Sequence, residues 1–150
     1  MSRIILLDAG PLGILANPSL SALAFQCRNW ADALLAQGDQ LMISEVADYE
    51  VRRELLRAGK TKSIARLDLL KTSLLYLPIN TATMLKAAEF WAQARQMGKP
   101  TAHHLRLDAD MILVAQAALL IEDGDGVIIA TSNVSHLSLF APAFKWQDIS

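Results

Sequence analysis

The sequence predicts an α/β fold, with three layers in which helices cover both faces of a central, mainly parallel sheet of four to five short strands. Short apolar segments, such as "IILL" and "VIIA", read as strands buried on both faces, because they lack the alternation of a half-exposed strand. Longer segments with helical spacing of apolar residues lie between them. This alternation of strand and helix is typical of a parallel sheet.

The predicted strands are short and end at polar or turn-forming residues, and they fall at residues 3–8, 40–44, 75–79, 127–130 and 144–149. Because Pro78 cannot donate a hydrogen bond to a ladder, the third strand is expected at an edge. The predicted helices keep an apolar stripe, and they fall at residues 20–38, 45–59, 62–75, 82–98 and 108–122.

Turn and capping residues set the boundaries of these helices. Ser19 or Ser21 is expected to cap the first helix, Thr81 the fourth and Asp108 the fifth. Gly38 and Gly59 follow two of the helices, as glycines at helix ends do. The Gly- and Pro-rich segment 9–19 is predicted to be a loop with at most a short helix, and residues 99–106 a connection.

Composition narrows the class of protein. The chain has 150 residues and predicts a single domain, 1–150, with a large core, since 53% of its residues are hydrophobic. The apolar run that begins at Ile4 ends at Asp8, so we expect neither a signal peptide nor a membrane anchor. A single cysteine, Cys27, excludes an intrachain disulfide and favours a cytoplasmic location.

Charge is unevenly distributed along the chain. The formal net charge of −1 predicts no general attraction to nucleic acid, yet residues 52–71 hold seven Lys or Arg residues against two acidic ones. Two solvated helix faces would explain this segment. A flank that contacts phosphate groups is the alternative, and we keep both interpretations.

Polar side chains follow three of the predicted strands. They are Asp8 after the first, Ser44 and Glu45 after the second, and Thr131, Ser132 and Asn133 after the fourth. Because ligand sites form at the carboxyl ends of parallel strands, we expect these groups at one edge of the sheet, beside Asp108 and Asp110. An oxygen-rich cluster of this kind suits a hard cation such as Mg²⁺ or Mn²⁺.

Each acidic residue also has a structural interpretation. Asp8 could cap the turn that follows it, and Asp108 is well placed as a helix N-cap. Asp110 shares a helical face with Leu113, Val114 and Ala117, where a purely solvated role is awkward. Glu50 is ambiguous by itself, since charged neighbours surround it. The three histidines, His103, His104 and His136, are interpreted as solvated or capping residues.

The order of these motifs resembles that of a PIN-domain ribonuclease, of the kind found as the VapC-like toxin of VapBC toxin–antitoxin pairs. "IILLDAGPL" is similar to the opening strand with its aspartate, Asp8. "MISEVADYEVRREL" resembles the segment whose helix bears a glutamate, here Glu50. "DMILVAQAALL" resembles the block that begins with an aspartate, here Asp110. "VIIATSNVSHLSLF" is similar to the closing strand and loop, with Asn133 at the diagnostic position.

The resemblance implies an endoribonuclease that depends on Mg²⁺ or Mn²⁺. It implies catalytic roles for Asp8, Glu50, Asp110 and Asn133, of which the three acids hold the metal ion. In two places the sequence departs from the family pattern: Ala9 and Gly10 follow the first aspartate, and Asn133 replaces a common acidic residue. Asp108 could supply the missing charge as a further metal ligand.

The resemblance also implies contacts to other molecules. Thr131, Ser132, Arg52 and Arg53 would contact the RNA substrate. A small antitoxin protein would occupy the cleft, and the toxin would be a homodimer.

Two other functions stay open. The chain could be a catalytically weakened PIN-like module that binds RNA or a protein partner. It could also be another α/β protein, such as a receiver domain or a phosphotransferase, although no aspartate ends the third strand and no lysine follows "VIIATS" closely.

Overall fold

The computed structural model describes residues 3–97, 104–134 and 137–150. Within these residues, five strands form one sheet in which every neighbouring pair is parallel, in the order β3-β2-β1-β4-β5. The strands are β1 (Ile4–Leu7), β2 (Gln40–Ser44), β3 (Leu75–Leu77), β4 (Val127–Thr131) and β5 (Ala143–Lys145). The predicted α/β class and parallel sheet are confirmed, and the third strand does lie at an edge.

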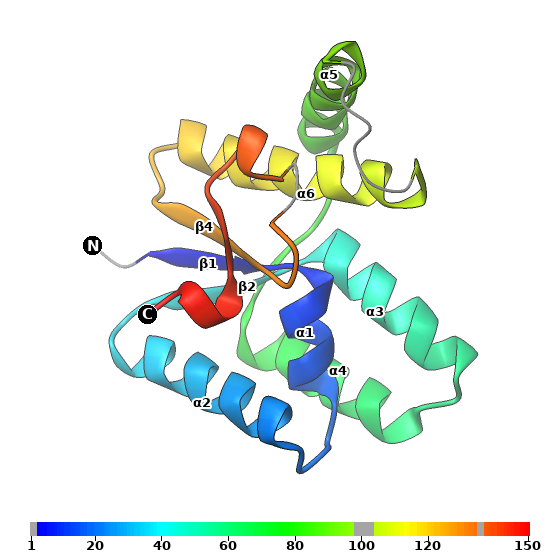
Figure 1. Ribbon diagram of the computed structural model, residues 1–150, viewed down its shortest axis with the longest axis vertical. Helices are drawn as coiled ribbons and strands as arrows, with labels where there is room; N and C mark the ends of the chain where they lie inside the picture. The colour runs from blue at the N-terminus through cyan, green and yellow to red at the C-terminus, as the bar shows by residue number, and fades with distance from the viewer. Residues whose placement is uncertain (1–2, 98–103, 135–136) are drawn as a thin grey trace.

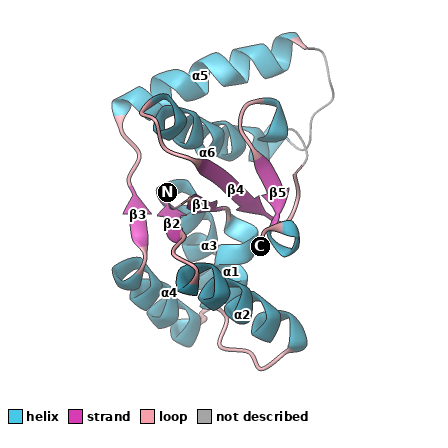
Figure 2. Cartoon of the chain, turned by 90° about the vertical axis from the view of Figure 1, so that its left-hand side faces the viewer, coloured by secondary structure: helices cyan, strands magenta, loops and turns pink. Residues whose placement is uncertain are grey.

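Helices cover both faces of this sheet (Figures 1 and 2). They are α1 (Ala9–Ala16), α2 (Ala22–Ala36), α3 (Glu45–Arg57), α4 (Thr61–Ser73), α5 (Thr81–Gln96) and α6 (His104–Glu122). Figure 2 shows α5 and α6 on one side of the strands and α2 and α4 on the other. Two short 3₁₀ helices, η1 (Leu137–Leu139) and η2 (Trp146–Asp148), flank β5.

The side-chain alternation of β1 divides the core in two. Ile4 and Leu6 pack with Met111 and Leu113 of α6, whereas Ile5 and Leu7 pack with residues of α1, α2 and α4. All four β1 side chains are buried, which is why the strand reads as a continuous apolar run. Burial of each such side chain stabilises the fold by about 1.5–3 kcal/mol.

Several helix boundaries differ from those predicted. Helix α6 begins at His104, so Asp108 lies inside the helix and is not its N-cap, and residues 104–106 are not a connection. Asn80, not Thr81, caps α5 by accepting a hydrogen bond from the Thr83 amide at 2.9 Å. These errors arise because Asp and Thr are good caps wherever they occur, while tertiary packing decides how far a helix extends.

Other predicted helix ends are confirmed, and the last predicted strand is longer than the observed one. Ser21 caps α2, and Gly38 and Gly59 adopt positive φ angles after α2 and α3. The segment after Asp8 forms a short helix, α1. The final strand is shorter than predicted, because the chain turns into η2 at Trp146. The interpretations of His103 and His136 concern residues outside the described ranges.

An ion pair joins the start of β1 to the turn before β2. The Arg3 guanidinium contacts Asp39 Oδ2 at 2.8 Å, and Gln37 Nε2 donates to the same oxygen at 2.6 Å. These hydrogen bonds favour the charged carboxylate and hold the pKa of Asp39 well below its usual range.

This pair predicts a pH dependence of stability. Because the pKa of Asp39 is lower in the folded state, its contribution is complete above the unfolded pKa of about 4 and is lost as the pH falls below it. We expect the free energy of unfolding of Asp39→Asn to fall less steeply than that of the wild type between pH 5 and 2. Urea denaturation across this range measures the free energy of unfolding of both proteins. If the two free energies changed in parallel with pH, the role of Asp39 would be contradicted.

Candidate active site

The strand order reverses between β1 and β4, and in open parallel sheets ligand sites form at such a reversal, outside the carboxyl ends of the strands. Asp8 follows β1 directly, and Thr131 ends β4. Thr131 Oγ1 donates a hydrogen bond to Asp8 Oδ2 at 2.7 Å, and Asp8 Oδ1 accepts one from the Ala9 amide at 2.7 Å. Asp8 therefore caps α1 and faces the end of β4 with its other oxygen.

The loop after β4 continues this arrangement. The Asn133 amide donates to Thr131 Oγ1 at 3.1 Å, so the buried Thr131 hydroxyl links Asp8 to the backbone of the loop. The side chains of Ser132 and Asn133 are exposed. The predicted meeting of Asp8 with the residues after β4 is thus observed, while the role of Asn133 in catalysis stays a prediction.

Gly10 permits the close approach of α1 to this loop. A Cβ atom at position 10 would overlap the Ser132 side chain, with only 2.7 Å to its Cβ and 3.3 Å to its backbone nitrogen. Gly10 departs from the family pattern, and the position of Ser132 explains why a residue without a Cβ atom fits there.

We expect Gly10→Ala to destabilise the protein by about 1–3 kcal/mol, because this overlap forces α1 and the β4 loop apart. Combining it with Ser132→Gly, which removes the nearest atoms, should recover part of that loss. A double-mutant cycle by urea denaturation measures the coupling between the two positions. Additive effects would show that the two residues do not interact.

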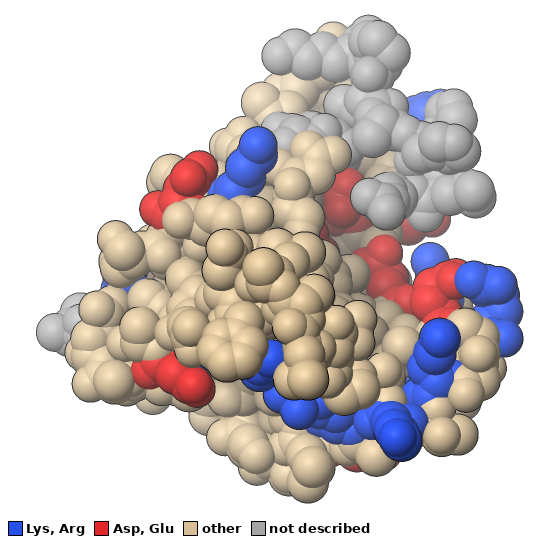
Figure 3. All heavy atoms as spheres, turned by 60° about the horizontal axis from the view of Figure 1, so that its bottom comes forward, with Lys and Arg blue, Asp and Glu red and all other residues tan. Residues whose placement is uncertain are grey.

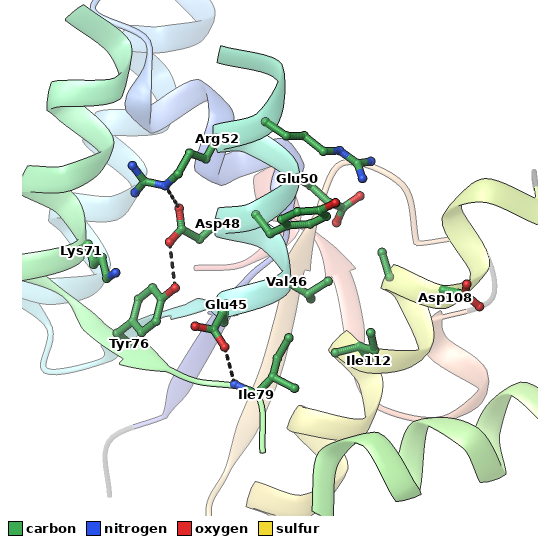
Figure 4. A pocket seen from close by; sticks show the side chains of 13 residues that line it. Glu45, Val46, Asp48, Glu50, Arg52, Lys71, Tyr76, Ile79, Asp108 and Ile112 are labelled. Carbon is green, nitrogen blue, oxygen red and sulfur yellow. Dashed lines mark hydrogen bonds and ion pairs between the residues drawn. The ribbon is translucent and has the colours of Figure 1, made fainter. Parts of the chain in front are cut away.

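A pocket of about 700 Å³ opens between α3, the region of β3 and α6 (Figure 4). Glu50 lines it from α3 and Asp108 from α6, together with the apolar side chains of Val46, Ile79 and Ile112. Glu50 is half-buried and Asp108 is exposed. The sequence analysis places both carboxylates in one predicted ligand set, and the fold brings them to the wall of one pocket.

Two further acids on α3 hold the walls of this pocket together. Glu45 Oε1 accepts a hydrogen bond from the Ile79 amide at 2.8 Å. Asp48, which is 5% exposed, accepts hydrogen bonds from Tyr76 Oη at 2.8 Å and from Arg52 Nε at 3.1 Å. Burial and the Asp48 carboxylate raise the pKa of the Tyr76 phenol, which therefore stays protonated and acts as a donor.

Asp48 is a residue of this pocket that the sequence did not single out. The available signal was its position beside Ala47 and one turn before Val51, both buried, with Arg52 four residues later. Each charged residue of this helix also suited a solvated face, so periodicity could not select the buried one. Asp48 lies two residues before Glu50 on the same helix.

The predicted basic flank lies beside these acids. Figure 3 shows Asp and Glu side chains in a hollow that Lys and Arg side chains border on one side. Arg53 and Lys71 line the pocket, and Arg53 is exposed, with its guanidinium 5.1 Å from the centre of the Tyr49 ring. Arg52 is held instead between Asp48 and Asp68, the latter at 2.8 Å, so its contact with substrate stays a prediction.

The predicted metal ligands are all carboxylates, a donor set whose chemistry fits a hard cation. Asp110 is half-buried on α6, on the face that carries the buried Leu113, Val114 and Ala117, as predicted. Within the described residues, however, no three His, Cys, Asp or Glu side chains converge as a metal site would require. Metal binding by Asp8, Glu50 and Asp110, or by Asp108, therefore stays a prediction.

Three solved structures with a similar arrangement of helices and strands are VapBC complexes. Chains of VapBC2 from Rickettsia felis, bound to a promoter DNA fragment, and of VapBC-1 from nontypeable Haemophilus influenzae match with TM-scores of 0.70 and 0.69. Their sequence identities are 14% and 18%, over 96% and 97% of this chain and 99% and 100% of theirs. DNA-bound VapBC from Salmonella typhimurium matches with a TM-score of 0.61, at 14% identity over 97% of this chain and 99% of that one.

The chain has a PIN-like fold. At these identities the likeness establishes the fold, and it confirms the architecture that the order of the sequence motifs predicted. No family model matches the sequence, and no curated protein is significantly similar to it. In the PIN-like fold, Asp8 and Thr131 occupy the point of strand reversal. Among the described residues, no helix is both long and apolar enough to cross a membrane.

Proposed function

We propose that this chain is a divalent-metal-dependent endoribonuclease and the toxin of a toxin–antitoxin pair. The supporting observation is the position of Asp8 at the strand reversal of a PIN-like fold, where Thr131 orients its carboxylate. The resemblance of the four motifs and the fold shared with VapBC complexes point to the same function.

In this proposal Asp8, Glu50 and Asp110 hold the metal ion, with Asp108 as a further ligand. A bound Mg²⁺ or Mn²⁺ would lower the pKa of water and neutralise charge on the phosphate oxygens. Thr131 keeps one Asp8 oxygen fixed by its hydrogen bond. The exposed side chains of Ser132 and Asn133 are available to orient the phosphate or water.

Binding of RNA is assigned to the basic side of the pocket. Arg53 and Lys71 present positive charge beside Glu50, and their contacts would be to the RNA backbone and independent of base sequence. Arg52 has its guanidinium in two ion pairs, so its main effect would be to fix α3 and α4 beside the substrate.

The test of nuclease activity is cleavage of a labelled single-stranded RNA with Mg²⁺, Mn²⁺ or EDTA. We expect cleavage with either metal and none with EDTA, because in this proposal the cation both activates water and neutralises the charge of the acids toward RNA. Equal cleavage with EDTA would reject the metal-dependent mechanism.

A catalytically weakened module that binds RNA is the second candidate. Two observations favour it: Asn133 is neutral where an acid is common, and the described acids do not form a preformed three-ligand site. Binding of RNA without cleavage at any metal concentration would support this candidate over the first.

Toxicity and assembly need separate tests. We propose that a small antitoxin occupies the cleft and that the toxin is a homodimer, for which exposed apolar side chains of α5 such as Leu85 and Trp91 offer a surface. Expression of the chain alone should slow growth, and coexpression of the neighbouring small open reading frame should restore it. Light scattering would determine the oligomeric state.

A further inference from the structure

A second cavity, of about 460 Å³, lies between the end of α1 and the start of α4. It shares no lining residue with the pocket of Glu50. No carboxylate lines it, and the residues that do are Gly13, Asn17, Pro18, Leu55, Gly59, Lys60, Thr61, Lys62 and Ser63. The cavity is therefore electrically positive, unlike the acid-lined pocket.

The first turn of α4 directs unpaired backbone donors toward this cavity. Lys60 is the N-cap of the helix and its side chain provides no capping hydrogen bond. The Thr61 amide donates to the Gly59 carbonyl at 3.1 Å, and the Ile64 amide to the Lys60 carbonyl at 3.0 Å. Among the described residues the amides of Lys62 and Ser63 have no acceptor.

Ser63 gives an independent indication of a ligand. Its side chain lines the cavity and is only 8% exposed, yet its hydroxyl has no hydrogen-bond partner within the described part of the chain. No fully enclosed side-chain oxygen or nitrogen of the described residues lacks a partner, so the Ser63 hydroxyl keeps some access to solvent, and Ser63 is a lining residue of this cavity. A largely buried hydroxyl without a partner, on a residue that lines a cavity, is suited to contact a bound group.

Charge determines what that group is. Two free amides at a helix N-terminus favour an anion, and the exposed Lys60 and Lys62 add two positive charges at the rim. Hydroxyls of Thr61 and Ser63 can donate further hydrogen bonds. This combination of amides, hydroxyls and ammonium groups matches the oxygens of a tetrahedral phosphate.

We infer that this cavity binds a phosphate group of the RNA backbone, distinct from the phosphate that is cleaved. The identity of the ligand rests on the proposed function. Helix α1 connects the two sites: Asp8 caps its start, and Asn17 follows its end. At about 1.5 Å per residue this separation is on the order of 13 Å, which a single strand spans within a few nucleotides.

The direct test is an NMR titration of the ¹⁵N-labelled protein with inorganic phosphate. We expect the amide resonances of Lys62 and Ser63 to shift saturably, and those of Lys145, an exposed lysine on β5, to stay in place. A non-cleavable 2′-O-methyl RNA, added with EDTA, should shift the same two amides and compete with phosphate. Absence of any shift at Lys62 and Ser63 with phosphate would overturn the site.

Two variants test the effect on RNA binding. Ser63→Asp introduces a negative charge at the start of α4, where it stabilises the helix but repels phosphate. We expect RNA binding to weaken at least several-fold, and the Tm is measured alongside because position 63 is largely buried. Lys62→Gln should lower the slope of log Kd against log salt by about 0.7, the value for one phosphate contact with a single strand. Lys145→Gln, with the same charge change, is the matched control.

The outcomes separate this inference from the proposed function. If the protein cleaves RNA and Ser63→Asp binds it as tightly as the wild type, the phosphate site is wrong and the nuclease proposal stands. If phosphate shifts Ser63 but the RNA does not, the assignment to the RNA backbone is overturned. Binding of a short RNA that reaches only the Asp8 site should be unaffected by Ser63→Asp.

Discussion

Replacing Asp8 with Asn is expected to lower the rate of RNA cleavage by on the order of 10²–10³-fold, the effect of losing a principal electrostatic group at a reacting phosphate. Asn keeps the shape of the side chain, caps a helix as well as Asp does, and can accept the Thr131 hydrogen bond. The change therefore removes the negative charge with little effect on the fold. Initial cleavage rates in Mn²⁺ together with the Tm measure the two effects.

A matched control for this variant is Asp32→Asn, because Asp32 is an exposed residue of α2. It should cleave RNA like the wild type. If Asp8→Asn also cleaved at the wild-type rate, then Asp8 would be only the cap of α1, and the proposed nuclease site would be incorrect.

Removing the buried carboxylate of Asp48 is expected to lower the free energy of unfolding more than removing any other acidic side chain that lines the pocket of Glu50. Asp48→Ala leaves the Tyr76 hydroxyl without its acceptor and takes one of two acidic partners from Arg52. We expect the free energy of unfolding to fall by about 2–3 kcal/mol, the cost of unpaired groups in a largely buried network. Urea denaturation followed by circular dichroism measures this change.

Asp68→Ala provides the comparison, because Asp68 pairs with the same guanidinium but 59% of its side chain is exposed. Its loss should cost less than about 1 kcal/mol, as for other surface ion pairs. Equal losses for the two variants would show that burial of Asp48 contributes nothing. Asp48→Asn, which can still accept from Tyr76, should fall between them.

Much of the fold follows from local sequence. The continuous apolar runs of β1 and β4 exclude a half-exposed strand, and the glycines after α2 and α3 end those helices because they adopt positive φ angles. The helices between the strands then require a parallel sheet. The start of α6 could not be located in this way. The residues just before Asp108 carry no strong signal for or against a helix, while Asp108 itself suits an N-cap.

The site was only partly predictable. Asp8 and Thr131 could be placed together because both end strands whose carboxyl ends share one edge of the sheet. Asp48 could not be distinguished from its charged neighbours on α3, since its burial depends on β3 and α4 packing beside that helix. The cavity at Ser63 depends likewise on how the end of α1 meets the start of α4.

The sequence by itself determined the class of fold, the order of its elements and the residues that reach the end of each strand. These follow from short-range physics: apolar runs, helical spacing and turn residues act over a few positions. Only the tertiary structure decided which charged groups are buried, which share a pocket and which pair with one another. Those properties depend on contacts between segments far apart in the chain, such as Tyr76 with Asp48, and no local pattern encodes them.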